Sequence, residues 1–190
     1  MNKVLRHLPN VLTGLRLMAA PATAGLLVAG HFNAAFGIFA FAGLSDAADG
    51  FLAKRFGFAT RLGRILDPVA DKALMLAAFV TLALLEDVPA WLAAVVIGRD
   101  VLIVLALSVG MSVQAPLSIQ PSQLGKLCAA MQVIYVGLHL AALAFGFSLA
   151  ALVPYDAYVL AAVAFASTLT YFGVWLKAMR AVWSRGAIPG

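Results

Sequence analysis

Four aspartates lie close together in a chain that is otherwise strongly apolar, and they form two pairs: Asp46 with Asp49, and Asp67 with Asp71. Residues three or four apart share one face of an α-helix, so each pair would present its two carboxylates together. Four neighbouring carboxylates repel one another unless protons or cations relieve the repulsion. Ligation by oxygen alone suits a hard divalent cation, and two such ions, Mg²⁺ or Mn²⁺, would neutralise all four groups. The pattern therefore predicts a metal site.

A simpler alternative is that the aspartates form salt bridges with Arg61, Arg64 and Lys72. That alternative is sufficient for one aspartate at a helix end, whereas two helical pairs on consecutive segments favour a shared cation. Two small residues follow the first pair. Gly50 and Ala53 leave room beside the carboxylates, either for a ligand or for the close approach of another helix.

The segments that carry these pairs belong to a chain of membrane composition. Of the 190 residues, 64% are hydrophobic and 11% are charged, against about 45–50% and roughly 25% in soluble domains. Apolar segments of nearly the ~20 residues that a bilayer requires can be drawn at 11–30, 34–53, 66–85, 89–111, 124–146 and 157–176. We expect an all-α integral membrane protein with six transmembrane helices, a short N-terminal amphipathic segment and a single domain over residues 1–190.

The basic residues indicate how the helices are oriented. With six spans, the loops at 54–65 and 112–123 lie on the same side as both termini, and Lys and Arg gather there. The opposite loops, near 31–33, 86–88 and 147–156, contain neither. By the positive-inside rule both termini are cytoplasmic, so the aspartates lie at cytoplasmic helix ends. We expect a bacterial inner-membrane protein whose site faces the cytoplasm and whose basic surface meets anionic lipid, with no nucleic-acid partner.

The aspartates belong to a longer motif with fixed spacing. It reads Asp46-x-x-Asp49-Gly50-x-x-Ala53-Lys54, eight residues, then Gly63-x-x-x-Asp67-x-x-x-Asp71. This resembles the signature of the CDP-alcohol phosphatidyltransferases, D-x-x-D-G-x-x-A-R, eight residues, G-x-x-x-D-x-x-x-D. The one departure is Lys54, which stands where the signature has arginine and keeps the charge without the bidentate fork.

The resemblance implies an enzyme that transfers phosphatidyl from CDP-diacylglycerol to an alcohol and releases CMP, using two divalent cations. It assigns metal binding to Asp46, Asp49 and Asp67, and makes Asp71 a shared ligand and the catalytic base. A second match, of "LPNVLTGLR" to the family's first-helix P-N-x-L-T-x-x-R, adds further contacts. The implied nucleotide-binding residues are Asn10, Thr13, Arg16, Gly50, Ala53, Lys54 and Gly63. The family also implies a homodimer.

Two further cations within the spans could bind a phosphate on the acceptor, Arg99 and Lys126. The alternative for Arg99 is an ion pair with Asp100, although neighbours on a helix point apart. "GRDVLI" and "PSQLGKLCAAMQ" resemble the CMP-forming cardiolipin synthases more than the phosphatidylglycerophosphate synthases. We therefore favour phosphatidylglycerol as acceptor, which gives cardiolipin, with glycerol 3-phosphate as the alternative.

Two other classes also use membrane carboxylates. Intramembrane prenyltransferases place their two aspartate motifs far apart in sequence, whereas here both lie between Asp46 and Asp71. A divalent-cation transporter would continue its ionisable residues into the outer half of the helices. Glu86 and Asp87 lie near the far surface, but no polar path joins them to the four aspartates. His139, in mid-span, is expected to make a hydrogen bond between helices.

Overall fold

The computed structural model describes residues 3–56, 63–112, 122–149 and 155–184. For residues 3–13, 46–56, 63–69, 107, 111 and 181 it describes the backbone alone. Throughout this part of the chain the regular elements are α-helices, and it contains no strand. The predicted all-α class is therefore confirmed.

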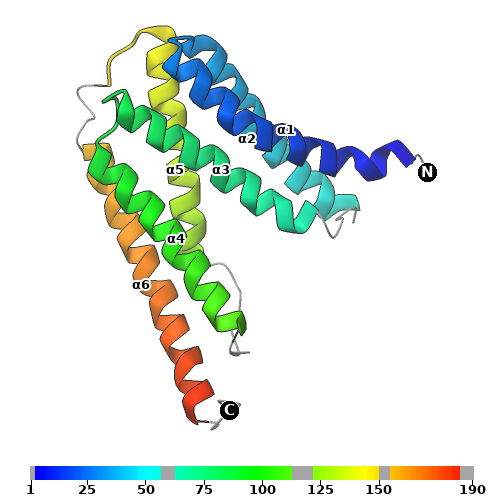
Figure 1. Cartoon of the computed structure of the whole chain (residues 1–190), viewed down its shortest axis with the longest axis vertical. Coiled ribbons are helices and arrows are strands. Elements are labelled where there is room, and N and C mark those ends of the chain that lie inside the picture. Colours follow the sequence, from blue (N-terminus) through cyan, green and yellow to red (C-terminus); the bar gives the residue numbers. More distant parts are fainter. Residues whose placement is uncertain (1–2, 57–62, 113–121, 150–154, 185–190) are drawn as a thin grey trace. The chain divides into compact units, whose positions relative to one another are not determined.

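Six helices follow one another along the described chain (Figure 1). They are α1 (Lys3–Val28), α2 (Phe32–Phe56), α3 (Gly63–Leu84), α4 (Ala90–Ser112), α5 (Gln123–Phe145) and α6 (Tyr155–Ser184). Each contains most of one predicted span. The N-terminal segment is continuous with the first span in α1, and α6 runs past the predicted end at residue 176 to Ser184.

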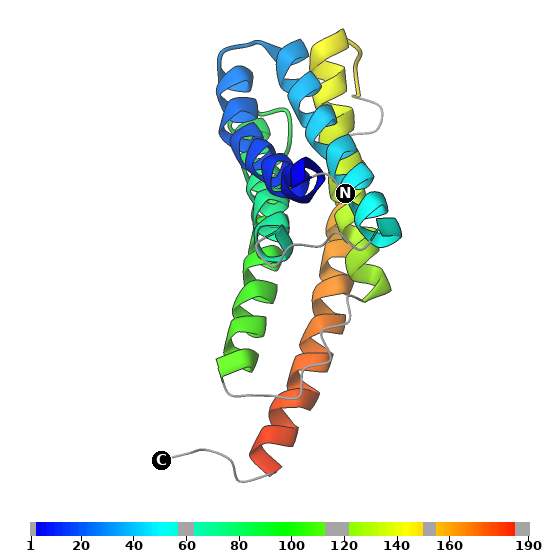
Figure 2. The same cartoon turned by 90° about the vertical axis from the view of Figure 1, so that its right-hand side faces the viewer.

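Turns with a glycine of positive φ end two of the described helices, α1 and α5. After α1, Gly30 adopts a φ of 76°, and the backbone N–H of His31 donates to Leu26 O at 2.8 Å. This is the left-handed helix end that glycine favours. The turn brings α2 back alongside α1, as Figure 2 shows in dark and light blue. Gly146 ends α5 in the same way, with a φ of 71°.

The described helices have membrane character. Three segments are long and apolar enough to cross a bilayer, Ala90–Gly110, Gln123–Phe145 and Tyr155–Ser184, and two shorter apolar helices are Gly14–Val28 and Phe32–Ser45. Large apolar side chains are also exposed along them. On α4, Val101, Leu102, Val104 and Leu105 are each at least half exposed. Soluble monomers rarely expose contiguous apolar surface on this scale, so the chain is an integral membrane protein.

The chain divides into two compact units, which are described separately: Met1–Ala90 with Val133–Ala151, and Trp91–Gln132 with Leu152–Gly190. In the first unit α1 packs against both α2 and α3, and Phe79 is fully buried and stacks on Tyr135 at 6.1 Å between centroids. In the second unit the Trp175 indole N–H donates to Ala106 O at 3.0 Å, which joins α6 to α4. The single domain over 1–190 stays a prediction.

Candidate functional site

The motif aspartates lie on two consecutive helices. Asp46 and Asp49 are in the last part of α2, and Asp67 and Asp71 are in the first part of α3. The helical backbone gives each pair the spacing that places two residues on one face. Four carboxylates as a donor set fit hard divalent cations, and here they come from two helices that are consecutive in the chain. Asp71 is half-buried.

Most of the motif side chains are outside the described residues. This applies to Asp46, Asp49, Gly50, Ala53, Lys54, Gly63 and Asp67 of the motif, and to Asn10 and Thr13 of α1. Among the side chains that are described, no three His, Cys, Asp or Glu residues are grouped so that they could hold a metal ion. Because three of the four aspartates are not in that set, the metal site remains a prediction.

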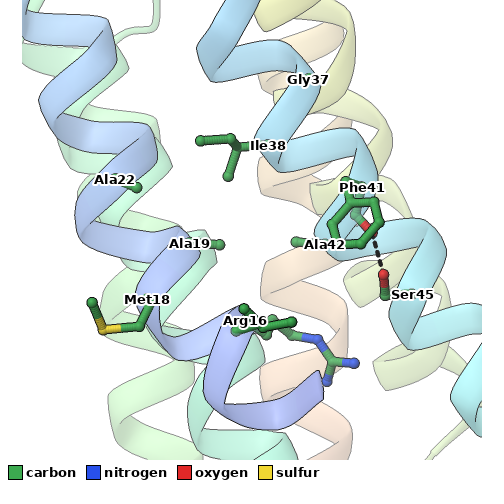
Figure 3. A pocket seen from close by; sticks show the side chains of 10 residues that line it. Arg16, Met18, Ala19, Ala22, Gly37, Ile38, Phe41, Ala42 and Ser45 are labelled. Carbon is green, nitrogen blue, oxygen red and sulfur yellow. Dashed lines mark hydrogen bonds between the residues drawn. The ribbon is translucent and has the colours of Figure 1, made fainter. Parts of the chain in front are cut away.

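Arg16 lines a groove between α1 and α2. The groove has a volume of about 320 Å³ and runs from Ala22 and Gly37 at one end to Arg16 and Ser45 at the other. Figure 3 shows the Arg16 side chain extending from α1 toward α2 at the Ser45 end. Only 3% of Arg16 is exposed. The groove thus has a buried cation at the end nearer the aspartate motif, because Asp46 directly follows Ser45.

Arg99 is held by two partners in the second unit. Its side chain is 7% exposed; Nη1 donates to Asp100 Oδ1 at 2.6 Å, and Nη2 donates to Ser167 Oγ at 2.7 Å. The ion pair with Asp100, which the sequence left as an alternative, is therefore present, because a long guanidinium reaches around the helix to its neighbour. Binding of an acceptor by Arg99 stays a prediction.

Sequence reasoning missed Ser167, which is fully buried on α6. The available signal was local. Ser167 opens a short polar run, with Thr168, Thr170 and Tyr171, inside an otherwise apolar helix. A buried polar side chain in such a helix needs a hydrogen-bond partner, but the run does not identify which residue of α4 supplies it.

Lys126 is exposed on the first turn of α5. Ser122 begins this turn, since its Oγ accepts the Gly125 N–H at 2.9 Å. Tyr171 of α6 lies against the same turn, because a Cβ added at Gly125 would be 2.9 Å from the Tyr171 hydroxyl oxygen. Ser167 and Tyr171 are four residues apart and share a face of α6. One face of α6 therefore contacts Arg99 and the residue next to Lys126.

The hydrogen bond found for His139 joins its helix to a turn, whereas its mid-span position predicted a bond between two helices. Its Nδ1 lies 2.7 Å from Asp87 Oδ2, and its ring lies 4.5 Å from that of Tyr135. His139 is 2% exposed. The partner comes from the turn between α3 and α4, which this contact fixes to α5.

A comparison with protein families identifies one match along nearly the whole chain. The model of a family described as CDP-alcohol phosphatidyltransferase matches residues 6–176. The match includes the described helices from α1 to most of α6 and all positions of the aspartate motif.

Individual relatives are similar to about half of the chain. A cardiolipin synthase (CMP-forming) / mitochondrial hydrolase fusion protein of Schizosaccharomyces pombe is 45% identical over 101 residues, 53% of this chain and 17% of that protein. Human cardiolipin synthase (CMP-forming) is 39% identical over 100 residues, which are 52% of this chain and 33% of that protein. A CDP-diacylglycerol–glycerol-3-phosphate 3-phosphatidyltransferase of Pseudomonas fluorescens is 40% identical over 103 residues, which are 51% of this chain and 52% of that protein. The chain thus spans at most about half the length of these relatives.

Proposed function

Because the chain belongs to the CDP-alcohol phosphatidyltransferase family, we propose that it transfers phosphatidyl from CDP-diacylglycerol to the hydroxyl of a glycerol-type alcohol and releases CMP. The observation that carries this proposal is the family match over residues 6–176, within which the complete aspartate motif lies on two consecutive helices. A membrane-embedded chain suits the substrate, since the acyl tails can remain in the bilayer during the reaction.

The family is generally metal-dependent. Asp46, Asp49, Asp67 and Asp71 would hold two divalent cations, Mg²⁺ or Mn²⁺, which when bound neutralise pyrophosphate charge and polarise the attacked phosphorus. Asp71 takes the proton from the acceptor hydroxyl as its oxygen bonds to the phosphatidyl phosphorus. The bond from that phosphorus to the CMP oxygen breaks, and CMP leaves with the bonding electrons.

The remaining predicted residues bind the two substrates. The nucleotide and pyrophosphate are assigned to Asn10, Thr13, Arg16, Gly50, Ala53, Lys54 and Gly63. The acceptor is assigned to Arg99 and Lys126. The Arg99–Asp100 ion pair supports phosphatidylglycerol over glycerol 3-phosphate, because a pair of zero net charge leaves less positive charge for a dianionic phosphate. Glycerol 3-phosphate remains the second candidate acceptor, because the similar proteins include a glycerol-3-phosphate phosphatidyltransferase as well as cardiolipin synthases.

The decisive experiment supplies purified protein with CDP-diacylglycerol, Mg²⁺ or Mn²⁺, and either phosphatidylglycerol or glycerol 3-phosphate, and measures CMP and the lipid product. We expect CMP release with at least one acceptor and its loss in Asp67→Ala. Asp156→Asn is the matched control, because Asp156 is an acidic residue at the start of α6, outside the motif. The proposal fails if neither acceptor gives CMP, or if Asp67→Ala releases CMP as fast as the parent protein.

The membrane arrangement is part of the same proposal. All six helices cross a bacterial inner membrane, both termini and the active site face the cytoplasm, and the protein forms a homodimer. The loop charges and the orientation rule for Lys and Arg support the orientation. Cys128 is the only cysteine and is buried, so cysteines introduced at the loops can be labelled selectively from either side. Labelling of residues near 31–33 from the cytoplasmic side would contradict this topology, and chemical cross-linking in membranes tests the dimer.

A further inference from the structure

The groove between α1 and α2 has the composition of a binding site for an amphiphile. Apart from Arg16 and Ser45, its walls are apolar or glycine, with Ala19 of α1 facing Ala42 of α2 (Figure 3). The small residues leave space between the helices. The volume of about 320 Å³ is at the lower end of the range for ligand pockets, roughly 300–1,000 Å³.

The groove opens sideways along the two helices. Leu15, Met18 and Phe41 line it and are each more than half exposed. In a membrane protein such exposed apolar side chains meet lipid, so the groove is open to the hydrocarbon. The lining extends from Ser45 to Gly37, which corresponds to about 12 Å along an α-helix. An extended hydrocarbon chain can therefore enter from the bilayer and lie between α1 and α2.

Charge and position indicate which end of a lipid lies at each end of the groove. The buried Arg16 cation lies at one end of an otherwise apolar groove, and it complements a phosphate joined to an acyl chain. Ser45, at the same end, immediately precedes the first motif aspartate and lies one helical turn before Asp49. A lipid with its phosphate at Arg16 therefore has that phosphate near the part of α2 that carries the aspartates.

We propose that the α1–α2 groove binds one acyl chain of CDP-diacylglycerol, with Arg16 at the phosphate that bears the diacylglycerol. This inference rests on the proposed function, because it takes the lipid substrate from it. It adds the path of the acyl chain and makes the width of the groove, set by Ala19, Gly37 and Ala42, a determinant of chain selection.

The test combines a substitution that narrows the groove with substrates of different acyl-chain length. A Cβ at Gly37 would meet nothing within 4 Å, so Gly37→Leu places a larger side chain in the groove without a clash at Cβ. Gly43→Leu is the matched control, since Gly43 is on the same helix, also has open space at Cβ and does not line the groove. KM is measured with dioleoyl and with dibutanoyl CDP-diacylglycerol.

We expect Gly37→Leu to raise the KM for the dioleoyl substrate by about fivefold, because the long chain loses packing contacts while lipid and groove are equally apolar. The KM for the dibutanoyl substrate and both KM values of Gly43→Leu stay unchanged. An equal rise for both chain lengths, or no rise for either, overturns the groove assignment while leaving CMP release, and with it the proposed function, intact.

A second measurement does not depend on turnover. CDP-diacylglycerol with a photoreactive group in one acyl chain is cross-linked to the wild-type protein in vesicles, with and without competing lipid. We expect labelled peptides from α1 and α2, reduced by unlabelled CDP-diacylglycerol but not by dioleoylphosphatidylcholine. Labelling confined to other helices, or equal competition by both lipids, overturns the assignment, and this result stands even if the protein releases no CMP.

Discussion

The Arg99 guanidinium connects α4 and α6, two helices of the second unit, and its hydrogen bonds are charge-assisted. One partner, Asp100, is its neighbour on α4, and the other, Ser167, is on α6. A charged group inside a membrane protein is costly unless it is paired. Hydrogen bonds to charged groups contribute about 1.5–3 kcal/mol each, so both partners offset the burial of Arg99 and fix its orientation.

Removal of the Ser167 hydroxyl, the second partner of Arg99, tests whether this bond affects acceptor binding as well as stability. We expect Ser167→Ala to lower the unfolding free energy by about 1–3 kcal/mol and to raise KM for the acceptor, with KM for CDP-diacylglycerol unchanged. Thermal unfolding in detergent and steady-state kinetics measure the two effects. Thr170→Val is the control, since Thr170 is exposed on α6 and its hydroxyl bonds only to backbone carbonyls of its own helix. A rise in both KM values would show that Ser167 acts on the fold as a whole.

At the scale of elements, the start of α5 depends on its contact with α6. Gly125 is the residue that allows the contact, because a Cβ there would lie 2.9 Å from the Tyr171 hydroxyl oxygen and 3.1 Å from Ser122 Oγ. The neighbouring residue is Lys126, so the position of this turn determines where one predicted acceptor-binding cation lies.

We expect Gly125→Ala to destabilise the protein by about 1–3 kcal/mol through overpacking and to raise KM for the acceptor. Tyr171→Phe removes the hydroxyl, and the double variant should recover part of the loss, which a double-mutant cycle measures. Gly173→Ala is the control, because a Cβ at Gly173 has nothing within 4 Å. Additive effects of the two substitutions would contradict a direct contact.

At the scale of the whole molecule, the exposed apolar side chains are what require a bilayer. Leu102 lies near the middle of α4 and is 57% exposed. On insertion scales an aspartate at the centre of a membrane helix costs roughly 2.5–3.5 kcal/mol. We expect Leu102→Asp to reduce the protein recovered in the membrane fraction, and Ser112→Asp, at the end of α4, to leave it unchanged. Equal recovery of both variants would place Leu102 outside the hydrocarbon.

The sequence predicted the elements far better than their contacts. Long apolar runs located all six helices, since a span needs a fixed length of hydrocarbon. Motif spacing predicted shared helical faces for the four aspartates, and of these only Asp71 has a described side chain. The extension of α6 to Ser184 was missed because basic residues such as Lys177 end the apolar run without ending the helix. The contacts of Ser167, Tyr171 and Asp87 are made with residues that are distant in sequence. The periodicity of a single segment cannot predict such contacts.

The short separation of Arg99 and Asp100 has a consequence for biogenesis. Because the two residues are adjacent and their side chains already meet on α4, the pair can form as soon as that helix exists. A nascent chain is synthesised from its N-terminus, so α4 is made before the Ser167 segment of α6. The helix can therefore enter the bilayer as an electrically neutral unit, and the bond to Ser167 is added only when the last helix arrives.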